Sequence, residues 1–275
     1  MLAALAGIGS LVGVDYYQNG DVDRSIEIAC QVRDSLGEFG APLAELAKEE
    51  IGGVLSDSVQ SVISTAQQYV SNVIGSFGSQ DVGSLESIPE YTGETYVTVN
   101  GNQPVFSSDE KNASPYEYYS ELDSLGRCGY AEAKLSIELM PTEERGAIGS
   151  VKPSGWKTIK YSNIDGLYLY NRCHLIGYQL AGENANEKNL ITGTRYLNVT
   201  GMLPWENLIA DYIKETKDEV MYRVTPIFEG NNLVASGVQM EAESLGSDEI
   251  SFNIYVFNIQ PGIRIDYSNG NSWKE

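Results

Sequence analysis

The sequence is poor in the residues that most often carry chemistry. Its 275 residues include one histidine, His174, and three cysteines, Cys30, Cys128 and Cys173. No Cys-x-x-Cys pair is present, which excludes a zinc site of that type. Three cysteines are also too few for a disulfide framework. The sequence leaves open whether Cys128 and Cys173 bond to each other.

Basic residues are also scarce, with 18 lysines and arginines against 38 acidic residues and a formal net charge of −20. A chain with this charge repels polyanions over most of its surface. The exception is the stretch from Arg145 to Thr200, which holds seven basic and three acidic residues. Any chemistry on nucleic acids is therefore expected on this local patch.

Long hydrophobic runs are missing as well. The opening MLAALAGIGSLVGV is apolar but has no basic flank, because the first basic residue is Arg24. The run is shorter than the roughly 20 residues that span a bilayer, and it does not read as a secretory signal. We expect a packed helix here and no stable membrane span, with a truncated membrane hairpin as the alternative.

The hydrophobic pattern and the local composition divide the chain into three predicted segments. Residues 1–80 are expected to form a helical segment, because apolar residues recur at three- and four-residue spacing from Leu55 to Ile74. This segment is acidic and is interpreted as a packing or delivery element. Residues 81–90 are small, polar and glycine-bearing, and they predict a linker. Residues 91–275 are expected to form the main domain, of the α+β class with a central antiparallel sheet.

Two elements of the main domain stand out. Residues 166–174 predict a strand that carries Arg172 and His174 to its end. The second element is a helix with Pro204 in its first turn. Its apolar face repeats at helical spacing (Trp205, Leu208, Ile209, Tyr212, Ile213). Glu206 lies beside that face, where it can face the strand.

Three segments between 220 and 259 are separated by turns and predict an antiparallel meander.

These elements bring together residue types suited to phosphodiester hydrolysis. Histidine takes a proton near neutral pH, and amide oxygens such as those of Asn189 and Asn198 suit a hydrated magnesium ion. A single amide ligand leaves the charge of the ion available to a phosphate. Taken singly, each residue has an ordinary structural explanation, and only their combination favours a site.

The sequence around the histidine resembles a known family. Asn171-Arg172-Cys173-His174, followed by NANEKNLITGTRYLN, is similar to the DNA/RNA non-specific endonucleases. These are ββα-metal (His-Me finger) nucleases whose signature reads Asp-Arg-Gly-His. The resemblance covers about 91–275 and is strongest with the branch of secreted nucleases and type VII-secreted toxin domains. The chain departs from the signature at Asn171 and Cys173.

The resemblance implies a role for each matching residue. His174 would be the general base, and Asn198 the direct Mg²⁺ ligand. Glu206 would hold metal-bound water, and Asn189 would be an accessory amide. Arg172 would support the phosphate or the geometry of the site.

The implied function is a Mg²⁺-dependent endonuclease, with Mn²⁺ able to substitute, that acts on DNA and by extension on RNA. Arg195, Lys188 and Lys157 are the expected contacts to the nucleic-acid backbone. The expected role is an antibacterial toxin, secreted by a non-classical, type VII route, acting in the target-cell cytoplasm and neutralised by a cognate immunity protein. The alternatives are a nutritional or DNA-uptake nuclease, or a decayed nuclease that mimics nucleic acid as a binding protein.

Overall fold

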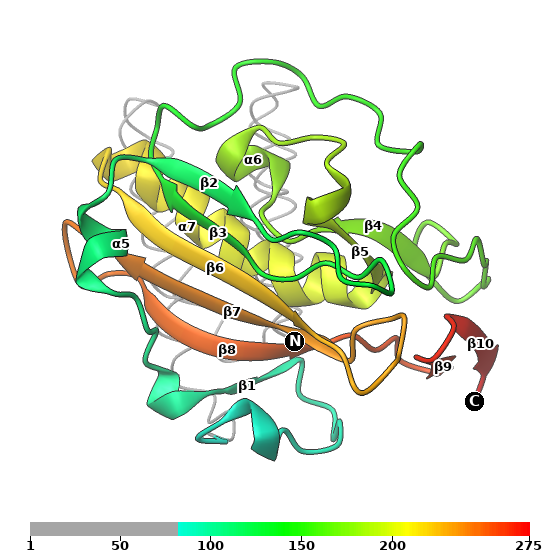
Figure 1. Ribbon diagram of the computed structural model, residues 1–275. Coiled ribbons are helices and arrows are strands. Elements are labelled where there is room, and N and C mark those ends of the chain that lie inside the picture. The colour runs from blue at the N-terminus through cyan, green and yellow to red at the C-terminus, as the bar shows by residue number, and fades with distance from the viewer. Residues whose placement is uncertain (1–81) are drawn as a thin grey trace, which may run out of the picture. The chain divides into compact units, whose positions relative to one another are not determined.

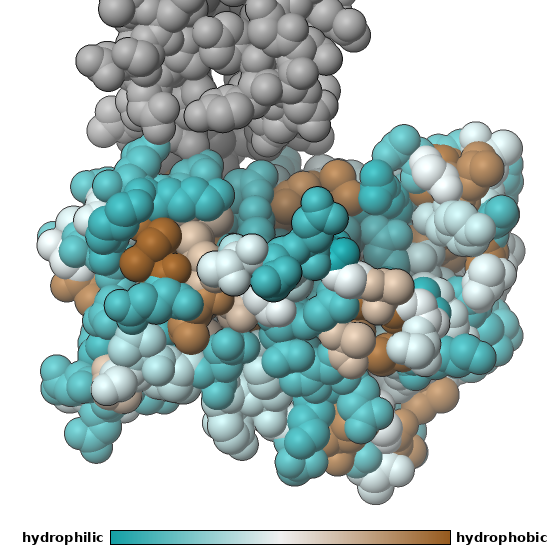
Figure 2. Space-filling model, turned by 90° about the horizontal axis from the view of Figure 1, so that it is seen from above, coloured by the Kyte–Doolittle hydropathy of each residue, from teal (hydrophilic) through white to brown (hydrophobic). Residues whose placement is uncertain are grey.

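The computed structural model describes residues 82–275, which belong to a compact unit spanning Ser79–Glu275. The helical segment expected at 1–80 lies outside these residues. Within the described part of the chain, no helix is long and apolar enough to cross a membrane. Seen from above, the surface is largely hydrophilic, and its hydrophobic residues form separate patches (Figure 2).

A six-stranded antiparallel sheet forms the centre of the unit, in the order β1-β8-β7-β6-β3-β2 (Figure 1). Strands β6, β7 and β8 follow one another in the chain and pair in register, which confirms the predicted meander. The α+β class with a central antiparallel sheet is likewise confirmed. The strands of the sheet are β1 (Tyr96–Thr98), β2 (Tyr116–Tyr119), β3 (Ala131–Leu135), β6 (Val220–Ile227), β7 (Gly237–Ser244) and β8 (Ser251–Phe257).

The long helix α7 (Leu203–Thr216) packs across one face of this sheet (Figure 1). It has proline in its first turn and ends at Thr216, followed by Lys217 in a left-handed conformation. Trp205 lies 4.6 Å from the ring of Phe252 and 5.3 Å from that of Tyr96, centroid to centroid. Because each large apolar side chain contributes about 1.5–3 kcal/mol when buried, this packing fixes the start of α7 on the sheet.

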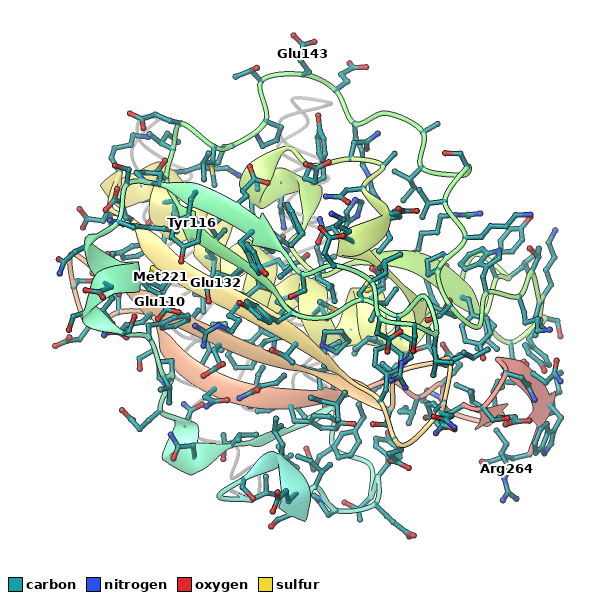
Figure 3. All side chains as sticks on the ribbon, in the orientation of Figure 1. Glu110, Tyr116, Glu132, Glu143, Met221 and Arg264 are labelled. Atoms are coloured by element: carbon teal, nitrogen blue, oxygen red, sulfur yellow. The ribbon has the colours of Figure 1, made fainter. Side chains whose placement is uncertain are left out.

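The opposite face of the sheet is polar and carries a charge cluster (Figure 3). Arg223 on β6 forms ion pairs with Glu132 on β3, with Glu110 at 2.8 Å and with Glu241 on β7 at 3.6 Å. Glu110 belongs to the short helix α5 (Ser108–Asn112), which begins with a capping box at Ser107. The cluster ties α5 to the sheet, and its carboxylates are largely satisfied within it.

The remaining elements lie beside the sheet. A two-stranded antiparallel ribbon, β4 (Tyr170–His174) with β5 (Leu190–Thr194), leads through a π-helical turn (Leu197–Met202) into α7. This gives the ββα order that the family resemblance implies. A second ribbon near the C-terminus pairs β9 (Ile263–Asp266) with β10 (Asn271–Lys274). Short helical turns are η2 (Leu85–Ser87), η3 (Asn100–Asn102), α6 (Tyr178–Ala181) and η4 (Glu187–Asn189).

The segment expected to be a linker at 81–90 instead packs on the sheet from Val82 onward. Val82 is buried in a cluster with Val97 and Tyr255, and its N–H donates to the carbonyl of Thr98 at 3.0 Å. Leu85 and Ile88 pack against the same cluster. These apolar residues are spaced among polar ones, so composition alone hides their burial.

Cys128 and Cys173 are both buried and both free thiols, which answers the question of a bond between them. Burial raises the pKa of the Cys128 thiol to about 12. The Cys173 thiol contacts the sulfur of Met202 at 3.4 Å. Both cysteines therefore serve as small core residues, and Cys173 is not a nucleophile paired with His174.

Candidate active site

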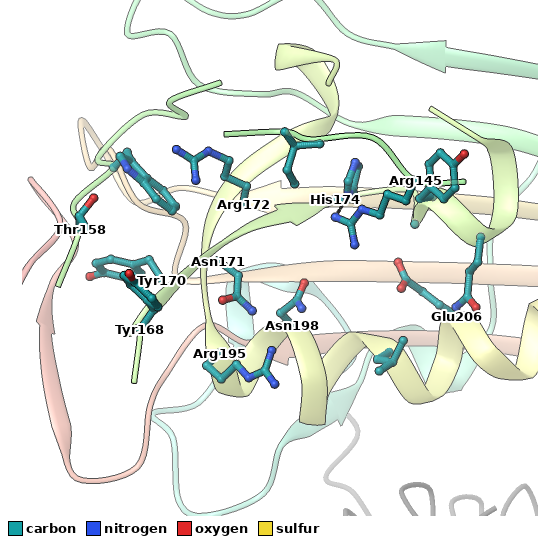
Figure 4. Close-up of a pocket in the computed structure, with 16 residues that line it drawn as sticks. Arg145, Thr158, Tyr168, Tyr170, Asn171, Arg172, His174, Arg195, Asn198 and Glu206 are labelled. Carbon is teal, nitrogen blue, oxygen red and sulfur yellow. Dashed lines mark hydrogen bonds between the residues drawn. The ribbon is translucent and has the colours of Figure 1, made fainter. Parts of the chain in front are cut away.

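A cavity of about 800 Å³ lies where the β4–β5 ribbon meets the start of α7 (Figure 4). Five of the candidate residues line it: Arg172, His174, Arg195, Asn198 and Glu206. They come from β4, from the turn after β5 and from α7, which converge at this point.

The imidazole of His174 is held in a defined orientation. Its Nε2 lies 2.7 Å from the backbone carbonyl of Asn184, and its Nδ1 lies 3.2 Å from Nη2 of Arg145. A guanidinium only donates hydrogen bonds, so Nδ1 accepts and the ring proton sits on Nε2, which donates to Asn184. The lone pair of Nδ1 therefore faces the cavity side of the ring, where Arg145 lies (Figure 4).

The environment of His174 favours its neutral form. The side chain is only 6% exposed. Burial lowers the pKa of the imidazole, the nearby charge of Arg145 lowers it further, and the hydrogen bond to Asn184 acts in the opposite direction. A neutral imidazole with an unprotonated Nδ1 at neutral pH is the state that a general base requires.

Glu206 places a buried carboxylate in the same cavity, one turn into α7. Burial raises its pKa to about 7, against the lowering effects of the Gly177 N–H, which donates to the carboxylate, and of Arg145. Gly177 is necessary for this arrangement, because a Cβ at that position would lie 2.8 Å from both carboxylate oxygens. The carboxylate therefore sits close to the border between its neutral and charged forms.

Asn198 supplies the amide expected of the site. It lies in the π-helical turn between β5 and α7 and lines the cavity between Asn171 and Glu206 (Figure 4). Asn171, at the position where the family signature has aspartate, also lines the cavity. Two neutral amide side chains and one carboxylate thus line the cavity.

Two arginines add positive charge to the cavity. The Arg172 guanidinium is held in place, because it donates to the carbonyls of Val151 and Gly149 and stacks on the ring of Trp156 at 4.1 Å. Arg195 forms an ion pair at 2.8 Å with Asp165, whose side chain is 85% exposed. Exposed pairs of this kind are weak, so Asp165 holds the Arg195 guanidinium only loosely.

Three predicted residues lie away from the cavity. Asn189 is fully buried: its Oδ1 accepts from the N–H of Ile176 at 2.9 Å and its Nδ2 donates to the carbonyl of the same residue at 3.0 Å. It fixes the chain just beyond His174 and does not reach the cavity. Lys188 is paired with Glu121 at 2.6 Å. Neither Lys188 nor Lys157 lines the cavity.

Other residues of the site escaped the sequence analysis. In the sequence Arg145 is only one base of the local patch, whereas in the structure its guanidinium contacts the imidazole. The carbonyl of Asn184 orients the ring, but a backbone group has no signature in the sequence. Gly177, three residues after His174, leaves room for the carboxylate of Glu206. A small residue so close to the motif histidine was the one available signal.

Comparison with known proteins finds a matching family and several similar structures. The family model of the DNA/RNA non-specific endonucleases matches residues 106–246, just over half of the chain. The structure of NucA from Streptococcus agalactiae with a magnesium ion bound is similar, at 23% identity and a TM-score of 0.61 over 70% of this chain and 94% of that one.

Two more structures share the fold. The metal-free form of the same NucA aligns at 24% identity and a TM-score of 0.60, over 70% of this chain and 92% of that one. Sda1 nuclease with a bound zinc ion aligns at 28% identity and a TM-score of 0.50, over 58% of this chain and 81% of that one.

The family match covers the β4–β5 ribbon, the residues that line the cavity and α7, and the structural matches share the overall fold. The chain therefore belongs to the DNA/RNA non-specific endonuclease family of ββα-metal nucleases, and it is a nucleic-acid-hydrolysing enzyme.

Proposed function

We propose that this enzyme is a Mg²⁺-dependent endonuclease that cleaves DNA, and RNA by the same chemistry, with His174 as the general base. The observation that carries the proposal is the fixed tautomer of the ring, with the proton on Nε2 and the lone pair on Nδ1. In this arrangement Nδ1 takes a proton from the attacking water. The Asn184 carbonyl then stabilises the imidazolium through its hydrogen bond with Nε2–H.

The donor set fits a hydrated divalent cation. Among the described residues, no group of three or more histidine, cysteine, aspartate or glutamate side chains could hold a metal. A cation here would therefore keep most of its water, as magnesium does. Asn198 would hold it directly and Glu206 through its water, and the opposite charge of the cation would favour the ionised carboxylate. When bound, the cation supplies charge that stabilises the phosphate oxygens as hydrolysis proceeds.

The donor groups of the cavity suit magnesium better than zinc. Zinc in proteins is held by sulfur and nitrogen ligands or by carboxylates, usually several of them. The cavity offers an amide and one buried carboxylate near the histidine. Bound magnesium in NucA is consistent with this choice, and Mn²⁺ is expected to substitute because it accepts the same oxygen ligands.

The arginines are expected to bind the phosphate. Arg145 lies in the segment between β3 and β4 and donates to Nδ1, where the attacking water must sit. Binding of substrate should therefore move its guanidinium from the ring to a phosphate oxygen, a stronger charge-assisted partner. Arg172 is held in place beforehand by two backbone carbonyls and by Trp156. A phosphodiester would thus be positioned from the backbone alone, without reading the base.

Cleavage of a supercoiled plasmid tests the proposal. The wild-type enzyme should nick and linearise the plasmid in Mg²⁺ and stop in EDTA. His174→Ala should lose about 10²- to 10⁴-fold in rate, with an unchanged circular dichroism spectrum. Wild-type levels of cleavage by a folded His174→Ala would refute the assignment of the base. Absence of cleavage by the wild-type enzyme with any divalent cation would instead favour the decayed, nucleic-acid-mimicking alternative.

For the biological role, we propose a secreted antibacterial toxin that reaches the target-cell cytoplasm by a non-classical route and is neutralised by an immunity protein. The support is the composition of residues 1–87, with three basic and twelve acidic residues, which differs from that of the catalytic region. Expression in a bacterial cytoplasm should kill the host unless the product of a neighbouring gene is present. Harmless expression of a nuclease that is active in vitro would favour the nutritional or DNA-uptake role.

A further inference from the structure

Two segments distant in sequence, 152–172 and 260–275, pack together beside the cavity and are called the aromatic lobe here. Ile263 is buried with Leu169 and Tyr170. The hydroxyls of Tyr161 and Ser272 lie 2.8 Å apart and join the segment leading into β4 to the β9–β10 ribbon. The lobe is therefore one packed surface.

Exposed aromatic rings on this lobe are each accompanied by a cation. Lys160 lies 4.5 Å from the centroid of Tyr168, and the guanidinium of Arg264 lies 5.9 Å from that of Trp273. The Tyr168 residue is 45% exposed and Trp273 is 49% exposed. Neither ring is needed to fill the core, and Arg264 lies at the outer end of the lobe (Figure 3).

The lobe is also positively charged within an acidic protein. Its two segments hold six basic residues and three acidic ones, whereas the whole chain has a net charge of −20. Nucleic-acid surfaces that do not read sequence combine cations along the backbone with aromatic rings on which bases stack. The lobe has this composition, because the exposed rings of Tyr168 and Trp273 lie beside Lys160 and Arg264.

The lobe is continuous with the active-site cavity. Trp156, Tyr168 and Tyr170 line the same cavity as His174. Tyr168 and Tyr170 lie at one end of it, whereas Glu206 lies at the other (Figure 4). Tyr168 and His174 are six residues apart, which along an extended chain corresponds to roughly 20 Å. A strand of nucleic acid crossing the cavity would therefore pass from Tyr168 to the catalytic centre.

We propose that the aromatic lobe binds a single-stranded segment of the substrate, with unpaired nucleobases stacked on Tyr168 and Trp273, and leads it to the catalytic centre. The bases of a duplex already stack on one another and cannot offer a face to these rings, so the lobe favours single strands over duplexes. The proposal rests on the nuclease function proposed above and names its preferred substrate class.

The test measures binding without cleavage. On the inactive His174→Ala background in EDTA, fluorescence anisotropy reports the affinity for a labelled oligothymidylate and for a duplex of equal length. Stacking contributes about 1–3 kcal/mol per base, so Tyr168→Ala and Trp273→Ala should each weaken oligothymidylate binding roughly 5- to 150-fold. Duplex binding should change less than threefold, because it depends on the cations alone.

Controls separate stacking from folding and charge. Tyr118→Ala removes a ring of similar exposure, 47%, on β2 at the edge of the main sheet, and should leave oligothymidylate affinity unchanged. Trp273→Phe should retain most of the affinity because it keeps a ring. An oligonucleotide with abasic positions should bind the His174→Ala protein as weakly as oligothymidylate binds the alanine variants.

Equal losses for single strand and duplex, or no loss at all in Tyr168→Ala and Trp273→Ala, would overturn the proposal. Failure of the nuclease assignment would appear separately, as absence of plasmid cleavage by the wild-type protein with any divalent cation.

Discussion

Replacing Gly177 by alanine should weaken catalysis through a single methyl group. The backbone at Gly177, with φ −59° and ψ 144°, is open to any residue, so the substitution causes no strain of its own. The added Cβ, however, would lie 2.8 Å from both oxygens of Glu206, where ordinary contact lies at 3.4–4 Å. Because the Glu206 side chain is buried, the carboxylate cannot simply swing into solvent.

The displaced carboxylate should weaken metal-dependent catalysis. Residues that hold a metal through its water typically account for 10- to 100-fold in metal affinity or activity. We therefore expect plasmid cleavage by Gly177→Ala to fall by about that factor, or to need a correspondingly higher Mg²⁺ concentration. Initial rates across a Mg²⁺ titration measure both effects.

A double-mutant cycle shows whether the methyl acts through Glu206. In a Glu206→Ala background the new Cβ has space, so Gly177→Ala should cause little further loss. Gly149→Ala is the matched control, because a Cβ at Gly149 meets no atom within 4 Å. Full activity in Gly177→Ala, or losses that simply add in the double variant, would refute this account of the carboxylate.

Three further predictions follow from the geometry. Arg145→Gln removes a charge that lowers the pKa of His174. The pKa should therefore rise, and the acid limb of the pH–rate profile should move to higher pH. An unchanged acid limb would contradict the contact between Arg145 and the imidazole. Asn189→Ala leaves both backbone groups of Ile176 without their partner and should cost about 1–3 kcal/mol in urea unfolding; unchanged stability would show that water replaces the amide. Lys188→Ala should leave the plasmid cleavage rate within about twofold, because an exposed ion pair contributes little. A tenfold loss would show that this lysine contacts the substrate.

The sequence predicted those features that depend on local periodicity. The face of α7, with Trp205, Ile209 and Ile213 buried, follows from helical spacing, and Pro204 marks its first turn. The β6–β8 meander follows from apolar strands separated by glycine-bearing turns. The convergence of His174, Asn198 and Glu206 came from the resemblance to the endonuclease family, since nothing in their spacing alone fixes a cavity.

The remaining features depend on contacts that sequence does not encode locally. Arg145 reaches the imidazole from 29 residues earlier, through a segment without regular helices or strands. Asn189 carries the amide expected in the site, yet both of its polar atoms are used by the backbone of Ile176. Residue type predicts that an amide binds something, but only the fold decides whether the partner is a ligand or the chain itself.

Chemical rescue of His174→Gly tests the central claim most directly. Initial rates of plasmid cleavage would be measured with a series of substituted imidazoles of different pKa, at saturating Mg²⁺ and constant pH. If the ring accepts the proton of the attacking water, added imidazole should restore activity, and the rate per neutral imidazole should rise with its pKa. Absence of rescue, or a restored rate that is the same for every imidazole, would contradict His174 as the general base.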